Sequence, residues 1–445
     1  MKPKGKKNNG ATYGRRSDWQ DLYSIAKKYY EALLADPGNA QFHLTDPRGA
    51  SDKSGRTFNN PYQYFFEQMH MDDAIYADES IYEYPMQQGG GNDGRPYSFG
   101  RPSSGGSKAA YPCKSYGQGR INPAYFYGVF DPNDMRRDVS ITMTGSNGKG
   151  VEKLIPFVPN SKAEGGGLTL NKWDENRQAN PWVAAQRKSG INGPYMRMSE
   201  VYLGYAEVCA ALGDVVTGKQ YLKTVRERSF PQGLANTDAF IASFGNDLVR
   251  AIIEERGFEY AGEGDRRWTL IRSGYLPEDI KRIKDMTKAM MDGLATKGYY
   301  EFENGNIISA YIWTKLVDAK TIYGHRLTAQ CPTDKVNDPV LYPGWRGQKD
   351  NWEEMGLNYG SSTPATNLAI KGLFEIVSEE EAASLESQGY AKVNWGIDLV
   401  DYRDEYDKYL FWDYDYVSAP IYLWPFTPNV MAAGGFTNGY GFKQE

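Results

Sequence analysis

The chain has 445 residues, of which 40% are hydrophobic and 24% are charged. These ordinary globular values exclude wholesale disorder, and the length allows a core that needs neither disulfides nor a metal for stability. The formal net charge of −5 argues against a dedicated nucleic-acid binder, because such proteins need a basic surface for phosphates.

The chain begins with a lysine-rich stretch that is followed by neither an apolar run nor a small-residue cleavage site. No run of about 18 apolar residues occurs in the sequence, so no membrane-spanning helix is predicted. Residues 17–20 (SDWQ) have the pattern of a capping box, and apolar residues then recur at helical spacing up to Leu33. This pattern predicts a helix that ends at residues 36–38 (DPG). Because it starts so early, we expect the chain to be the later part of a longer precursor.

Two long segments that follow show no regular periodicity. After a short aromatic helix predicted at residues 62–69, residues 88–120 are rich in Gly, Ser and Pro with scattered aromatic residues, and residues 140–192 are also irregular. Long ordered loops in compact proteins are often functional. We therefore expect ligand-binding residues in the segment 88–120.

Helical periodicity returns in the second half of the chain. It predicts helices at residues 195–212, 219–228, 247–262 and 277–293, and the first two form a helix pair of tetratricopeptide type. Residues 296–370 are predicted to be rich in loops. No linker divides the chain, so we expect one mainly α body over residues 1–445, with a helix and ligand-loop region (15–195), a helical region (195–293) and a loop-rich C-terminal region (294–445).

Two glutamates continue an apolar stripe of the helix predicted at 247–262. At about 100° per residue, Glu255 and Glu259 share a face with Leu248 and Ile252. They are either an acid/base pair of the glycosidase type or part of a structural ion-pair cluster, since buried carboxylates need partners. Nearby arginines would hold them ionised, so we favour a structural cluster. Its predicted members are Glu255, Arg256, Glu259, Arg266 and Arg272.

The same region resembles a known family. Residues 255–274 are similar to the ER-x-x-E…EG-x-R signature of the SusD/RagB family, with Thr269 in place of the usual Asp. Four other stretches agree with family motifs in the same order along the chain: 131–136, 195–207, 225–228 and 422–440. Ser199 departs from the usual Ala. The chain is therefore identified as a member of this family from about residue 15 to its end, with the family's N-terminal part missing.

The resemblance implies a largely helical, tetratricopeptide-like fold with irregular loops that present the ligand. It also implies a non-catalytic lipoprotein on the extracellular face of the outer membrane, although this sequence contains neither the signal nor the lipidated cysteine. The expected partners are an oligosaccharide ligand and a SusC-like TonB-dependent transporter that receives it. No nucleic acid is expected as a partner.

Aromatic residues in the glycine-rich loops are the candidate ligand contacts. The chain has 34 Tyr but 18 Phe, which favours rings that meet water at one edge. Sugars have apolar C–H faces and polar rims, which suit such rings. The alternative role of each ring is to anchor its loop on the body. The candidates are Tyr97, Phe99, Tyr111, Tyr116, Trp345 and Trp352.

No cofactor is expected. The three cysteines show no metal-binding spacing, and the carboxylates among residues 401–416 lack the regular spacing of a calcium loop, so no motif supports Ca²⁺. Three alternatives to oligosaccharide capture stay open: a glycoside hydrolase or lyase on a helical scaffold, a helical-repeat interaction module without a small ligand, and a peptide-binding member of the same uptake family.

Overall fold

The computed structural model describes most of the chain. The described residues are 16–38, 43–44, 46, 61–68, 79–90, 94–102, 114–146, 152–159, 166–174, 187–318, 366–410 and 427–435. The helices are α1 (Trp19–Ala35), α2 (Pro61–Gln68), α3 (Gly94–Phe99), α4 (Pro123–Gly128), α5 (Arg136–Ser140), α6 (Met198–Ala211), α7 (Val215–Arg228), α8 (Thr237–Ala242), α9 (Leu248–Glu259), α10 (Asp265–Ser273), α11 (Leu276–Lys297), α13 (Glu379–Ser387), α14 (Gly396–Asp401), α15 (Arg403–Leu410) and α16 (Pro428–Gly434). The strands are β1 (Ser80–Tyr84), β2 (Ile141–Thr142), β3 (Thr144–Ser146), β4 (Glu152–Leu154), β5 (Thr169–Leu170), β6 (Gly193–Arg197), β7 (Tyr299–Glu301), β8 (Ile307–Ser309), β9 (Tyr311–Asp318), β10 (Thr366–Lys371) and β11 (Ala391–Asn394).

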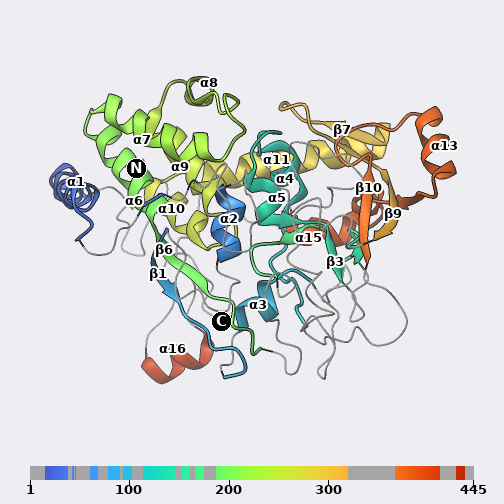
Figure 1. The fold of residues 1–445 in the computed structure, drawn as a ribbon, viewed down its shortest axis with the longest axis horizontal. Coiled ribbons are helices and arrows are strands. Elements are labelled where there is room, and N and C mark those ends of the chain that lie inside the picture. Colours follow the sequence, from blue (N-terminus) through green and yellow to red (C-terminus); the bar gives the residue numbers. More distant parts are fainter. Residues whose placement is uncertain are drawn as a thin grey trace.

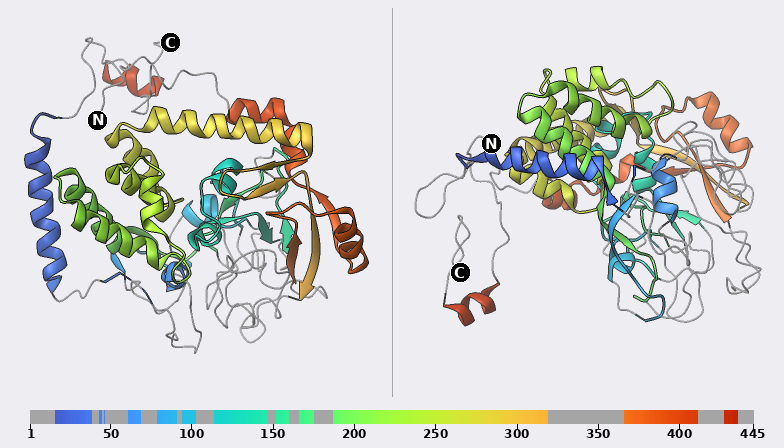
Figure 2. Two further views of the ribbon diagram at one scale, coloured as in Figure 1. Left: turned by 90° about the horizontal axis from the view of Figure 1, so that it is seen from above. Right: turned by 60° about the vertical axis from the view of Figure 1, so that its left-hand side comes forward.

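Helices α1 and α6 to α10 form one side of the molecule, and a small sheet with α13 forms the other (Figure 1). The long helix α11 runs along the edge between the two sides (Figure 2, left). The fold is thus mainly α, with helix pairs of tetratricopeptide type and long excursions, as the sequence predicts.

The helix pair α6–α7 is specified locally by its turn. Gly213 has φ +93°, a left-handed conformation that a glycine adopts without strain, and it ends α6. Asp214 then caps α7, because its carboxylate accepts a hydrogen bond from the backbone N–H of Thr217 at 3.3 Å. With so short a turn, the two helices pack antiparallel.

The predicted start of α6 was wrong by three residues. Residues 193–197 form strand β6, which pairs antiparallel with β1, and the helix begins only at Met198. The partner strand lies more than 100 residues earlier in the chain, so helical periodicity alone does not reveal it. Tertiary pairing overrides the local pattern here.

Helix α1 packs on α6 through only half of its apolar surface. Tyr23, Ala26, Tyr30 and Leu34 contact a cluster on α6. The other half of the apolar surface is the stripe that the sequence predicts, which consists of Leu22, Ile25, Tyr29 and Leu33. The first three of these side chains are exposed. The helix is therefore confirmed, but its apolar arc is wider than the face that α6 covers.

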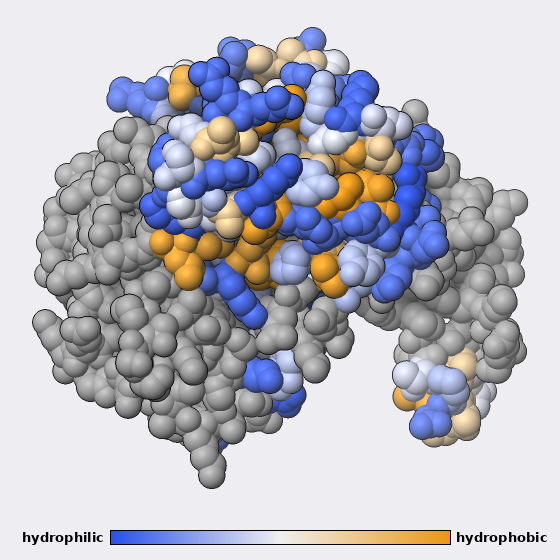
Figure 3. Space-filling view, turned by 90° about the vertical axis from the view of Figure 1, so that its right-hand side faces the viewer, coloured by the Kyte–Doolittle hydropathy of each residue, from blue (hydrophilic) through white to orange (hydrophobic). Residues whose placement is uncertain are grey.

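A three-stranded antiparallel sheet, in the order β10-β9-β11, lies in the region that the sequence predicts to be rich in loops. The prediction was wrong at β9, because the consecutive residues Ile312, Trp313 and Thr314 are all buried and give no alternating pattern. Helix α13 covers the outer face. On this side of the molecule, hydrophobic patches are interrupted by hydrophilic side chains (Figure 3), and Leu316 and Ile376 are half-exposed.

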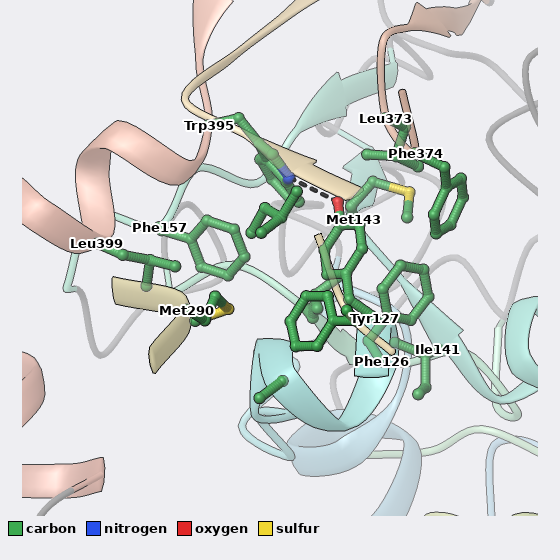
Figure 4. Close-up of a cluster of buried hydrophobic side chains, with 14 of the residues drawn as sticks. Phe126, Tyr127, Ile141, Met143, Phe157, Met290, Leu373, Phe374, Trp395 and Leu399 are labelled. Carbon is green, nitrogen blue, oxygen red and sulfur yellow. Dashed lines mark hydrogen bonds between the residues drawn. The ribbon is translucent and has the colours of Figure 1, made fainter. Parts of the chain in front are cut away.

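The main hydrophobic core joins the sheet to the central helices. The buried indole of Trp395 donates a hydrogen bond of 2.8 Å to the hydroxyl of Tyr127 on α4, and Phe157 packs on the same indole with ring centroids 4.3 Å apart (Figure 4). Met290 of α11 and Leu399 of α14 belong to the same cluster. This core includes residues of the described segments 114–146, 152–159 and 166–174, and the first of these segments also contributes to the candidate site.

Candidate functional site

Glu255 and Glu259 of α9 are completely buried. One carboxylate oxygen of Glu255 lies 2.7 Å from Arg136 and the other lies 2.9 Å from Arg226. Glu259 contacts Arg228 at 2.7 Å and Arg136 at 3.1 Å, and it forms a further ion pair with Arg197. Both acids are thus held by guanidinium groups on several sides and do not face an open cleft.

The assignment of Arg256, Arg266 and Arg272 as partners of these glutamates is wrong. Each of these arginines bonds to other acids instead. Arg256 pairs with Asp265 and Glu200, Arg266 with Glu254 and Asp279, and Arg272 with Glu207. The reason is the direction of the side chains, because neighbouring residues on a helix point about 100° apart. Arg256 therefore faces α10, while Glu255 faces the interior.

The true partners are four arginines that come from three other elements. Arg136 begins α5, Arg197 ends β6, and Arg226 and Arg228 lie on α7. A further acid, Glu79, was missed by sequence reasoning; it is buried just before β1 and bonds to Arg197 at 2.9 Å. The sequence did carry a signal for the arginines, because all four lie in the stretches that resemble family motifs.

The electrostatics of this cluster do not suit acid catalysis. Burial alone would raise the pKa of Glu259, but Arg197, Arg228 and Arg136 outweigh it and hold the pKa well below its usual range. Burial likewise favours a raised pKa for Glu79, but Arg228 and Arg197 outweigh burial, so that the pKa of Glu79 is also lowered. A general acid must carry a proton near neutral pH, whereas Glu259 is ionised there.

A second feature is a row of exposed rings on the ribbon formed by β1 and β6. Tyr82 and Tyr84 alternate with the buried Glu83, so that both rings point outward. Tyr195 of β6 is 74% exposed, and its ring meets that of Tyr82 edge to face at 5.5 Å. Such exposure of three large rings in one place is unusual for groups that contribute only to stability.

Helix α3 and the segment after residue 113 extend this row. The rings of Tyr97 and Tyr116 meet edge to face at 5.1 Å, and the backbone N–H of Tyr116 donates to the carbonyl of Tyr97 at 2.8 Å. Phe99 is 45% exposed. Arg95 connects the rings on the β1–β6 ribbon with those around α3. It lies on α3, and its guanidinium is 5.2 Å from the ring centre of Tyr84 on β1.

We call these six residues the ring surface: Tyr82, Tyr84, Tyr97, Phe99, Tyr116 and Tyr195. Three of them are sequence-predicted candidates, and the structure brings Tyr97 and Tyr116 into contact. Sequence reasoning missed Tyr82, Tyr84 and Tyr195. The alternation of residues 80–84 could have revealed Tyr82 and Tyr84, whereas Tyr195 joins them only through the pairing of β6 with β1. The other three candidates, Tyr111, Trp345 and Trp352, lie outside the described residues.

A small cavity of about 160 Å³ opens beside Tyr195. It lies between β6 and the turn from α9 to α10, and its lining includes Met196, Glu200, Tyr260 and Asp265. Tyr260 is buried, and its hydroxyl lies 2.9 Å from that of Ser199. The cavity gives one end of the ring surface a hollow with polar groups at its rim.

The described part of the chain contains neither a group of metal ligands nor a helix that could span a membrane. Within it, no three His, Cys, Asp or Glu side chains are grouped as metal ligands. No helix in that part has both the length and the apolar composition needed to span a bilayer.

Comparisons with known proteins agree on one family. Residues 41–426 match the sequence model of the SusD family. SusD-like protein P25 of Formosa agariphila is 28% identical over 160 residues, which are 36% of this chain and 26% of that protein. The chain thus spans about a quarter of the length of this curated relative.

Solved structures of similar proteins come from Bacteroides. A SusD homolog from Bacteroides thetaiotaomicron is 17% identical with a TM-score of 0.42, over 60% of this chain and 52% of that one. Surface glycan-binding protein A from Bacteroides thetaiotaomicron, in complex with laminarihexaose, is 19% identical with a TM-score of 0.37, over 58% of this chain and 51% of that one. The chain spans about half the length of these solved chains.

Proposed function

Because this chain belongs to the SusD family, we propose that it binds oligosaccharides at a cell surface without cleaving them and delivers them to a SusC-like TonB-dependent transporter. The single observation that carries the binding part is the ring surface. The delivery step, the transporter and a lipid anchor in the outer membrane rest on family membership alone.

The ring surface suits a sugar chain physically. A pyranose ring stacks its apolar C–H face on an aromatic ring, while its hydroxyl groups need polar partners at the rim. Tyr82, Tyr84 and Tyr195 offer exposed faces with phenol groups at their edges. Because the rings lie on a ribbon and a helix side by side, they offer successive contacts to an extended ligand. Tyr111, Trp345 and Trp352 are proposed as further contacts.

The buried glutamates support binding without cleavage. A glycosidase places two carboxyl groups on either side of the scissile bond, in contact with the substrate. Glu255 and Glu259 are 0% exposed and are held by four arginines. A sugar has no route to them without breaking the ion pairs.

Titration calorimetry against a panel of neutral and acidic hexasaccharides tests the binding proposal. We expect Tyr82→Ala and Tyr195→Ala each to weaken binding by about tenfold, since stacking on one ring contributes roughly 1–1.5 kcal/mol. Tyr311→Ala is the matched control, because Tyr311 is also an exposed tyrosine but lies on β9. Loss of binding in the control as well, or no binding to any sugar, would contradict the proposal.

The same panel separates the competing functions. New reducing ends after prolonged incubation, lost in Glu259→Gln, would establish a hydrolase. Binding to hexapeptides in place of sugars would establish the peptide-binding variant of the family. Co-purification with a SusC-like transporter expressed in the same cells tests the delivery step.

A further inference from the structure

Cations lie over three rings of the ring surface. The guanidinium of Arg187 lies 4.4 Å from the ring centre of Tyr97, and the ammonium of Lys114 lies 4.8 Å from that of Tyr116. Arg95 lies over Tyr84 at 5.2 Å. Cation–π contacts of this kind hold a charged group against one face of an aromatic ring.

Among the described residues around the rings, the charge that reaches solvent is mainly positive. In the described segments 79–90, 94–102, 114–120 and 187–197, the basic residues that reach solvent are Arg95, Lys114, Arg120, Arg187 and Lys188. The acidic residues in the same segments are Glu79 and Glu83, and both are buried. This local excess of positive charge contrasts with the net charge of −5 for the whole chain.

The two buried acids are already engaged in the interior. Glu79 bonds to Arg197 and Arg228, and Glu83 bonds to Ser80 and to Asn192 at 2.9 Å. Neither carboxylate therefore lies at the surface beside Lys114 or Arg187. The field at the outer surface of these segments is set by the basic side chains.

Acids reach the surface only near one end of the row in the described structure. Three acids, Glu200, Glu263 and Asp265, line the small cavity beside Tyr195. Glu200 and Asp265 bond to Arg256 and Glu263 bonds to Arg197, which neutralises part of their charge. The positive part of the ring surface is thus the α3 end, around Tyr97 and Tyr116. A ligand that spans the ring surface therefore meets positive charge at the α3 end and partly neutralised acids at the Tyr195 end.

We propose that the ring surface selects acidic oligosaccharides, with a carboxylate or sulfate group of the ligand at the α3 end. This inference rests on the proposed function and names its substrate class. Guanidinium groups form paired hydrogen bonds to carboxylate and sulfate oxygens, and an ammonium attracts either group as a point charge. Because each cation is held against a ring of the ring surface, a sugar bound at a neighbouring ring brings its acidic substituent within reach of the cation.

The experiment compares ligands that differ only in charge. Hexagalacturonate and its fully methyl-esterified form share sugar and linkage, and so do a sulfated carrageenan hexasaccharide and its desulfated form. Calorimetry on the wild-type chain at two salt concentrations is expected to show at least about fivefold tighter binding of each acidic form, with the difference shrinking at high salt. Tighter binding of only one acidic form identifies the group that is recognised.

Two variants and a matched control complete the test. Arg187→Gln and Lys114→Gln are expected to weaken binding of the acidic forms by about fivefold and to leave the neutral forms unchanged. Lys392→Gln is the control, because Lys392 also lies over a tyrosine ring, 4.3 Å from the centre of Tyr311 on the sheet side.

The outcomes separate the two proposals. Equal affinity for acidic and neutral forms, or an equal loss for both in Arg187→Gln, shows that the cations only brace their loops and overturns the inference while oligosaccharide binding stands. Absence of binding to every hexasaccharide overturns the proposed function itself.

Discussion

The carboxylate of Glu255 lies 2.7 Å from the guanidinium of Arg136, a residue 119 positions earlier in the chain. Both side chains are completely buried. The pair joins α9, on the helical side of the molecule, to α5. Helix α5 is followed directly by strand β2. A single ion pair thus ties two distant parts of the sequence together.

Breaking this pair on one side is expected to be costly. Glu255→Gln leaves Arg136 and Arg226 with an uncompensated buried charge, so the free energy of unfolding is expected to fall by about 3–5 kcal/mol. Urea denaturation followed by circular dichroism measures it. The control is Lys281→Gln, which removes an exposed charge, and its effect should stay within about 0.5 kcal/mol. A loss below about 1 kcal/mol in Glu255→Gln would show that the cluster is not structural.

The lowered pKa of Glu259 predicts a loss of stability in acid. The pKa of Glu259 is about 4.3 in the unfolded chain and lower in the folded chain. The ionised carboxylate therefore stabilises the fold fully above about pH 4.3. This contribution is lost as the pH falls below about 4.3 towards the folded pKa. Unfolding free energies of the wild type and Glu259→Gln between pH 7 and pH 3 provide the measurement. We expect the wild type to lose more stability than the variant over this interval, and parallel curves would contradict the assignment.

The bond between Trp395 and Tyr127 predicts a coupled pair in the main core. Tyr127→Phe leaves the buried indole N–H without its acceptor, which is expected to cost about 1–3 kcal/mol. In a double-mutant cycle with Trp395→Phe, the double variant should lose less than the sum of the two single variants. Thermal unfolding provides the values, and Tyr29→Phe on the exposed side of α1 is the control. Strictly additive losses would show that the hydrogen bond contributes nothing.

Two glycines with similar backbone conformations allow the cost of a steric clash to be measured apart from the cost of backbone strain. Gly167 has φ +71° and Gly233 has φ +83°, so alanine is strained at both positions. A methyl group on Gly167 would overlap the ring of Phe157, whereas one on Gly233 meets no atom within 4 Å. Gly167→Ala is therefore expected to lose about 1–3 kcal/mol more than Gly233→Ala in chemical denaturation. Equal losses would mean that the ring of Phe157 moves aside freely.

The sequence by itself determined the features that depend on near neighbours in the chain. Helical periodicity, the turn at Gly213 and Asp214 and the position of Glu255 and Glu259 on one apolar face of α9 all follow from residues within a few positions of one another. The family motifs already contained the four arginines that hold these glutamates. The sequence also singled out Tyr97 and Tyr116 from their place in a glycine-rich segment. That segment was predicted to be a loop, but it contains the short helix α3, and the role of the two rings as ligand contacts stays a prediction.

Only the tertiary structure decided which groups meet across the chain. The partners of Glu255 are Arg136 and Arg226, because packing of α5 and α7 on α9 brings those side chains to the buried face, while the arginines nearest in sequence point elsewhere. In the same way, Tyr82 and Tyr195 form one surface only because β1 and β6 pair over a separation of more than 100 residues. Spacing in a sequence fixes the direction of a side chain on its own element, but its contacts depend on how the elements pack.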